Sequence, residues 1–323
     1  MSELVICYLF LGGAGAGACA TLAVMGLFVP HTALVAVRVR GAQEAARTVV
    51  APPREYRRLF APTYLCAIGA LVLGIVILAA DLGNIDRLIL LVTQPEPTYV
   101  TLGAYALVVC TLLAVLLACV WASLLPRVPY AVFAAASVFM LVIAMVVMTY
   151  TGLLLKGLRA VALWDSVWLP VLFVLSALSC GIALVAIACQ FTGASRLFER
   201  TLRHLFAADA VFIVLEALAA AALVLSVWLA AREGWPSGTA AAAVGSLEAL
   251  LAGEVSRVFW IAFVGVGLAA PLAVELVSLR SRRASWAVAL LTSAFVLAGG
   301  LAMRYCIVEA GMRPVLFTAA MGM

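Results

Sequence analysis

The chain has 323 residues, of which 67% are hydrophobic and only 11% charged, with a formal net charge of +5. A soluble domain is nearer half apolar and a quarter charged, so one soluble core of this size could not hide so much apolar surface. The composition therefore excludes a soluble enzyme and predicts a protein whose main solvent is lipid.

Eight apolar runs, each long enough to cross a bilayer, follow one another along the sequence. A membrane-spanning helix needs about 20 mostly apolar residues, so eight such helices leave room only for short connections. Charged residues and helix breakers such as Pro52-Pro53 separate the runs. We expect an all-α integral membrane protein, a single polytopic domain over residues 1–323, with transmembrane helices near 4–30, 60–80, 99–125, 130–155, 167–190, 205–231, 255–279 and 285–308.

The basic residues are distributed unevenly between the two sides of the predicted membrane. The segments 38–58, 196–203 and 280–283 each carry three or more arginines, and all of them fall on the same side. Arginine and lysine concentrate in cytoplasmic loops. The pattern predicts that both termini are extracytoplasmic, and it accounts for the positive charge without a nucleic-acid partner.

Small residues mark the first and fifth predicted helices. Gly13 and Gly17 form a GxxxG pair in the first, and small residues at this spacing let a second helix backbone approach closely. We therefore expect these glycines to serve helix packing, whereas a phosphate-binding loop would follow a strand. A fainter stretch, Ser176–Gly181, lies in the fifth helix and suggests two four-helix bundles.

Three acidic residues fall within the inner halves of predicted spans. Asp209 and Glu216 are seven residues apart on one face of the sixth helix, and Glu275 lies near the inner end of the seventh. An ionisable group inside the membrane is costly, so each is a candidate functional residue. We expect them to begin a proton-transfer route from the cytoplasm; the competing interpretation pairs them with arginines such as Arg203 and Arg280.

Four more polar residues fall at the outer ends of the second, fourth and eighth helices, where they can converge. They are Asp81, Tyr150, Lys156 and Arg304. A quinol head needs hydrogen bonds to its oxygens and a base for its protons, which these side chains offer. Each also has a structural interpretation: a helix C-cap region for Asp81, an aromatic belt for Tyr150, a flanking anchor for Lys156 and helix pairing for Arg304.

The cysteines and histidines give no sign of a resident metal or haem. All eight cysteines lie in or beside apolar runs without a CxxC pair, whereas iron–sulfur clusters use grouped thiolates. Only His31 and His204 could ligate haem, fewer than a di-haem anchor needs. We expect no haem, iron–sulfur cluster or other metal site in this protein.

The order and spacing of several segments resemble the NrfD / polysulfide reductase membrane-subunit family over nearly the whole length. No single segment is specific, but together they are. They are Tyr8–Gly13, Asp81-Leu82-Gly83, Tyr150–Leu154, Trp168-Leu169-Pro170, Ser176–Gly181, Asp209 with Glu216, Phe259-Trp260 through Pro271 to Glu275, and Arg304-Tyr305.

The resemblance implies an eight-helix subunit of the prokaryotic cytoplasmic membrane that reacts with menaquinone or ubiquinone and has no redox cofactor of its own. Such subunits dock on an extracytoplasmic, ferredoxin-like iron–sulfur protein, often beside a molybdopterin catalytic subunit. The family's quinone pocket lies toward the outer face, and its acid and tyrosine match Asp81 and Tyr150 here. The first helix departs from the pattern, because its outer half has no histidine or asparagine.

Two other functions fit parts of the sequence. A proton-coupled secondary transporter of a small solute would also contain buried acids, and it often has helices broken near the midplane. Gly265-Val266-Gly267 and Pro271 are the nearest such break, and the third helix has no counterpart. A purely structural anchor leaves Glu216 unexplained. The sequence therefore favours the quinone-reactive subunit.

Overall fold

The computed structural model describes residues 3–38, 47–82, 99–125, 128–157, 161–194, 197–233, 237–280 and 286–321. Within these ranges, eight helical spans are long and apolar enough to cross a membrane, which confirms the predicted number. They are α1 (Glu3–Leu27), α3 (Arg54–Leu82), α5 (Tyr99–Trp121), α6 (Tyr130–Lys156), α7 (Trp168–Phe191), α8 (Glu199–Glu233), η3 (Val258–Ala269) continued by α10 (Ala270–Arg280), and α11 (Trp286–Met321). The shorter elements are α2 (His31–Leu34), β1 (Val35–Arg38), β2 (Arg47–Val50), η1 (Ala162–Trp164) and α9 (Ser237–Leu251).

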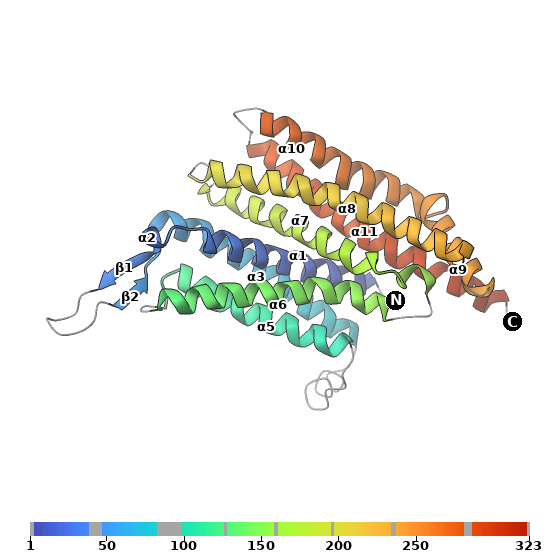
Figure 1. The fold of residues 1–323 in the computed structure, drawn as a ribbon, viewed down its shortest axis with the longest axis horizontal. Helices are drawn as coiled ribbons and strands as arrows, with labels where there is room; N and C mark the ends of the chain where they lie inside the picture. The colour runs from blue at the N-terminus through green and yellow to red at the C-terminus, as the bar shows by residue number, and fades with distance from the viewer. Residues whose placement is uncertain are drawn as a thin grey trace.

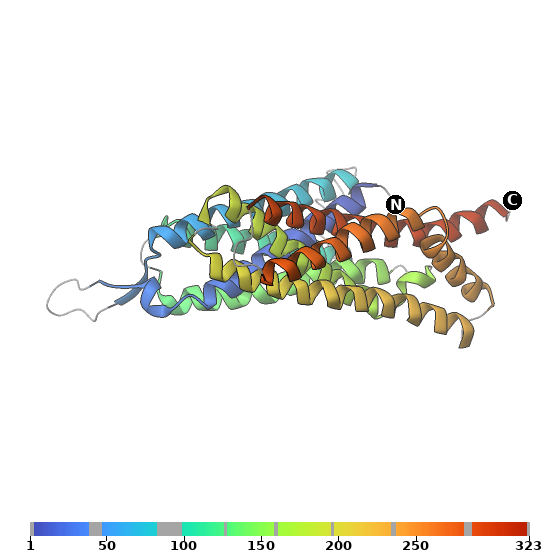
Figure 2. The same ribbon diagram turned by 90° about the horizontal axis from the view of Figure 1, so that it is seen from above.

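The spans lie side by side in an elongated bundle, seen from two directions in Figures 1 and 2, and their predicted grouping into two four-helix bundles remains a prediction. Helix α1 packs against α3, α6 and α7, and α7 in turn packs against α8 and α11. Both termini lie at the same end of the bundle, and β1 and β2 project from the opposite end (Figure 1). The predicted extracytoplasmic position of the termini remains a prediction.

Glycines bring α1 and α7 into backbone contact. A Cβ atom on Gly17 would overlap the backbone of Ala177, and one on Gly181 would overlap the backbone of Gly17. Gly13, one turn earlier on α1, faces Ala177 and the guanidinium of Arg304 instead. The glycine-rich face of α1 is therefore turned toward α7, and only residues without a side chain fit at the closest point.

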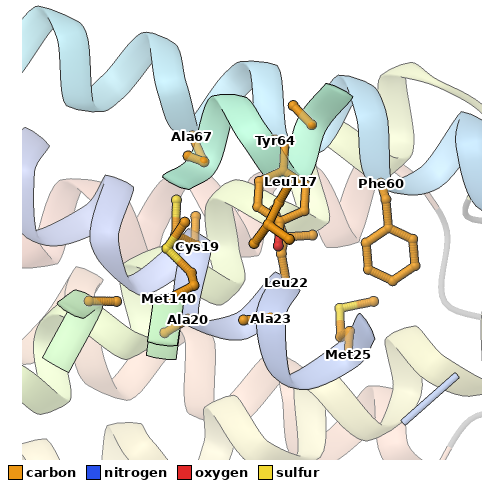
Figure 3. Packing of buried hydrophobic residues seen from close by; sticks show 14 of the residues in the cluster. Cys19, Ala20, Leu22, Ala23, Met25, Phe60, Tyr64, Ala67, Leu117 and Met140 are labelled. Carbon is orange, nitrogen blue, oxygen red and sulfur yellow. The ribbon is translucent and has the colours of Figure 1, made fainter. Parts of the chain in front are cut away.

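Small α1 residues also let larger side chains of α3 and α5 fill the core. Cys19 and Ala20 belong to one buried cluster with Tyr64 of α3, Leu117 of α5 and Met140 of α6 (Figure 3). Phe60 of α3 stacks on Trp121 of α5, with ring centroids 3.8 Å apart. The alternation of small and large residues gives close packing without a hydrophobic driving force between helices, as lipid-embedded bundles require.

The hairpin of β1 and β2 was not predicted from the sequence. β1 and β2 pair antiparallel, and Val50 donates a backbone hydrogen bond to the carbonyl of Val128 just before α6. The sequence of this segment indicates only a charged connection, because its two valine-rich runs are four residues each and arginines surround them. Valine favours strands, but so short a run gives a weak periodic signal.

Several helices extend beyond the predicted ends. α3 begins at Arg54 and α8 at Glu199, each about six residues before the apolar run that defined its prediction, and α11 continues to Met321. The added turns carry charges, so hydropathy alone could not include them. The 15-residue helix α9 was also missed, and it is too short to cross a membrane.

The seventh span is wound irregularly where the sequence suggested a break. Residues Val258–Ala269 form a π-helix, and the amide of Ala270 donates to the carbonyl of Gly265, five residues earlier. Gly267 lies directly against Gly299 of α11, so the two helices cross with their backbones in contact. The span therefore continues through the glycines instead of breaking, and π-wound turns are frequent at functional sites.

Candidate functional site

Two tyrosines and an aspartate from three helices come together at the end of the bundle that holds the termini. Tyr8 of α1 and Tyr150 of α6 are buried, 5% and 3% exposed, whereas Asp81 in the last turn of α3 is exposed. Tyr8 interacts electrostatically with both Tyr150 and Asp81. We call these three residues the tyrosine group.

Two glycines let neighbouring elements pack closely around Tyr150: Gly103 on the adjacent helix α5, and Gly152 two residues further along α6. A Cβ atom on Gly103 of α5 would overlap the ring of Tyr150, so the ring lies directly on the α5 backbone. A Cβ atom on Gly152 would lie 2.5 Å from the Cα of Pro170, which fixes the end of α6 against the start of α7. The backbones of α5 and α7 therefore restrict the position of the Tyr150 ring.

The tyrosine group combines hydrogen-bonding hydroxyls with a carboxylate that reaches the surface. Each tyrosine hydroxyl both donates and accepts, and the aspartate offers acceptor oxygens. Such a group can bind a ligand with oxygen atoms on an apolar ring and exchange its protons with water. Lys156 is the last residue of α6, half-buried and about 9 Å along the helix axis from Tyr150.

Arg304 belongs to a different group from the one predicted. Its guanidinium is completely buried among α1, α7 and α11, where Nη1 donates to the Ser176 hydroxyl at 3.3 Å and to the Gly300 carbonyl at 2.9 Å. The rings of Phe10 and Phe173 lie 5.6 and 5.3 Å from its central carbon. The predicted convergence with Asp81 and Tyr150 is therefore replaced by contacts in the bundle centre.

The three predicted proton-transfer acids lie in a row that leads to Arg304. Glu216 and Asp209 on α8 and Glu275 on α10 are only 4%, 2% and 2% exposed. Glu216 interacts with Ser176 and with the charge of Arg304, and Asp209 interacts with Glu275. We call Glu275, Asp209, Glu216 and Arg304 the acid–arginine row.

Many polar atoms of this row have no protein hydrogen bond. They are Oδ1 of Asp209, both carboxyl oxygens of Glu275, and Nε and Nη2 of Arg304, together with the hydroxyl of neighbouring Ser179. Buried polar groups are usually satisfied by protein or by ordered water. The row therefore has the polarity that water molecules need to occupy the bundle interior.

The competing interpretation paired these acids with Arg203 and Arg280. Arg203 is exposed near the start of α8, and the side chain of Arg280 lies outside the described residues. The acids interact with one another and with Arg304, and their pairing with Arg203 or Arg280 remains an alternative. Both groups contact helix α1: Tyr8 belongs to it, and Gly13, about 7.5 Å further along its axis, faces Arg304.

Three polar side chains in or beside these groups, Tyr8, Ser176 and Ser179, were not among the predicted site residues. Tyr8 stood within the first segment of the family resemblance, but a tyrosine near a helix end is also typical of an aromatic belt. Ser176 and Ser179 were seen only as small packing residues. Buried serines opposite acidic residues were the signal for their polar role, but pairing two helices correctly requires the fold.

Comparison with known proteins places this sequence in a family. It is 30% identical over 171 residues to the C subunit of the polysulfide reductase of Wolinella succinogenes, a match that covers 53% of this protein and 51% of that subunit. The match thus spans about half the length of this relative. A family model described as "Polysulphide reductase, NrfD" matches residues 2–315, which include the tyrosine group and the acid–arginine row. This multi-pass membrane protein therefore belongs to the NrfD polysulphide reductase family, as its sequence predicted.

Proposed function

We propose that the protein is the quinone-reactive subunit of a multisubunit oxidoreductase in a prokaryotic cytoplasmic membrane. It exchanges electrons between menaquinone or ubiquinone and an extracytoplasmic, ferredoxin-like iron–sulfur subunit, which a molybdopterin catalytic subunit accompanies. Family membership supports this proposal, and the name of the relative designates one subunit of a reductase. Both termini lie at the end of the bundle where the partner would dock (Figure 1).

The observation that carries the proposal is the tyrosine group. The hydroxyls of Tyr8 and Tyr150 are buried beside an exposed Asp81 carboxylate, so a quinone ring can be bound from the bilayer while its protons reach water. In this proposal Tyr150 and Tyr8 bind the quinone oxygens, and Asp81 exchanges the protons that accompany the electrons. Lys156, at the end of α6, adds a positive charge near the docking face.

The acid–arginine row supports a second element of the proposal, a proton route. Glu275 lies toward the hairpin end, and the row runs inward through Asp209 and Glu216 to Arg304. Unsatisfied oxygens along it can be joined by water molecules, which carry protons between carboxyl groups. The route would bring protons from the hairpin side toward the quinone.

Purification of the complex from native membranes in mild detergent, followed by mass spectrometry and quinol assays, tests the proposal. Co-purified iron–sulfur and molybdopterin subunits are expected, and Asp81→Asn or Tyr150→Phe should lower quinol-linked turnover by about 100-fold. Tyr305→Phe, which changes an exposed tyrosine of α11, is the matched control. A lone protein that binds no quinone would overturn the proposal in favour of a transporter.

A further inference from the structure

The lipid-facing surface carries an apolar groove between α8 and η3, far in sequence from the tyrosine group. Its volume is about 520 Å³, within the range of about 300–1,000 Å³ that ligand sites occupy. Its lining includes the aromatic side chains of Trp228, Trp260, Phe259 and Phe263 and the small side chains of Ala217 and Ala221. Trp228 and Trp260 are 40% and 53% exposed, so the groove opens toward the bilayer.

Two arginines lie at one end of the groove, where the exposed acid Glu254 precedes η3 as well. The guanidinium of Arg232, on the last turn of α8, lies over the ring of Trp228 with its central carbon 3.9 Å from the ring centroid. Arg257, which directly precedes η3, is exposed at the same end. Arginine and tryptophan at the end of a membrane helix mark the level of the lipid headgroups.

We infer that this groove binds an anionic phospholipid, with an acyl chain between α8 and η3 and the phosphate on Arg232. The groove walls are apolar along their length, which suits an acyl chain. The guanidinium over Trp228 lies on the last turn of α8, where a lipid phosphate group would meet it. Arg257 adds a second positive charge to the same headgroup region.

A quinone head fits this groove less well than a phospholipid. Among the residues that line it, the only polar side-chain atoms are the indole nitrogens, and Nε1 of Trp260 already donates to the carbonyl of Leu251 at 3.1 Å. These lining residues offer no counterpart of the Tyr8, Tyr150 and Asp81 constellation. The bound lipid would cover the surface where α8 and the π-wound η3 leave a gap, independently of the function proposed above.

Native mass spectrometry of the purified complex tests the inference by counting bound lipids. The probes are phosphatidylglycerol and phosphatidylcholine with identical acyl chains. The wild-type complex should retain phosphatidylglycerol preferentially, and Arg232→Gln should reduce that preference about fivefold. Arg58→Gln changes an exposed arginine at the opposite end of the bundle and should leave the preference unchanged.

A second variant distinguishes the contribution of the groove to lipid binding from the contribution of the Arg232 charge. Ala221→Trp fills the groove and should abolish retention of both lipids at this site, whereas Arg232→Gln should still retain phosphatidylcholine. Unchanged phosphatidylglycerol retention in both variants would overturn the inference. So would loss of a bound quinone, or of a partner subunit, in place of lipid from the Ala221→Trp complex.

Discussion

The aromatic ring of Tyr150 lies directly on the backbone of Gly103, so closely that a Cβ atom at this position would overlap it. Gly103→Ala must therefore move the ring, the α5 backbone, or both. If Tyr150 binds the quinone, a displacement of about 1 Å should lower quinol-linked turnover about 100-fold while the complex still assembles. Steady-state quinol assays of the purified complex measure this effect.

Gly69→Ala is the control for this prediction. Nothing lies within 4 Å of a Cβ atom at Gly69, on an exposed face of α3, so the change should leave turnover and stability as they are. Equal turnover in the Gly103→Ala and Gly69→Ala complexes would remove Tyr150 from the quinone site.

The contact between α1 and α7 gives a prediction about stability. Gly181→Ala places a methyl group into the backbone of Gly17, and the bundle must separate these helices to accept it. Overpacking of this kind costs about 1–3 kcal/mol. The thermal unfolding midpoint in detergent should fall for Gly181→Ala and stay constant for Gly69→Ala; equal midpoints would show that the helices separate without strain.

Sequence predicted which segments form the eight apolar spans better than it predicted which side chains are neighbours. The eight spans follow from apolar runs, because the thickness of a bilayer sets the length of the apolar run that a spanning helix needs. Arg304 was placed in the correct helix, but hydropathy does not tell which helices surround it. Its partners Gly13 and Ser176 come from spans one and five, and only the packing of α11 against α7 and α1 brings them together.

The same reason explains which parts of the candidate site could be predicted. Asp81 and Tyr150 follow from their positions at helix ends, and the family resemblance pointed to both. Tyr8 joins them only because α1 lies between α3 and α6. The pairing of Asp209 with Glu275 likewise requires α8 to lie against α10, which no periodicity in either segment indicates.

A buried hydrogen bond links the short helix η1 to the last span. The indole Nε1 of Trp164 donates to the carbonyl of Ile307 at 3.0 Å, and its ring rests on Gly311. Trp164→Phe removes this donor and should lower the free energy of unfolding by about 1 kcal/mol. Trp168→Phe, at a half-exposed position, is the control, and equal unfolding midpoints for the two variants would contradict a stabilising role for the bond.

The acid–arginine row makes the final prediction, because Glu216 is its link to Arg304. Glu216→Gln keeps the size of the side chain and its ability to bond Ser176, but it removes a group that can carry a proton. Proton uptake coupled to quinol turnover should fall at least about tenfold, measured with a pH indicator trapped in vesicles that contain the complex. Glu248→Gln changes an exposed acid on α9 and should leave uptake unchanged. If Glu216→Gln reduces stability but not uptake, the row serves only to hold α7, α8 and α11 together, since Arg304 would then act as a structural partner of Ser176 and Gly300.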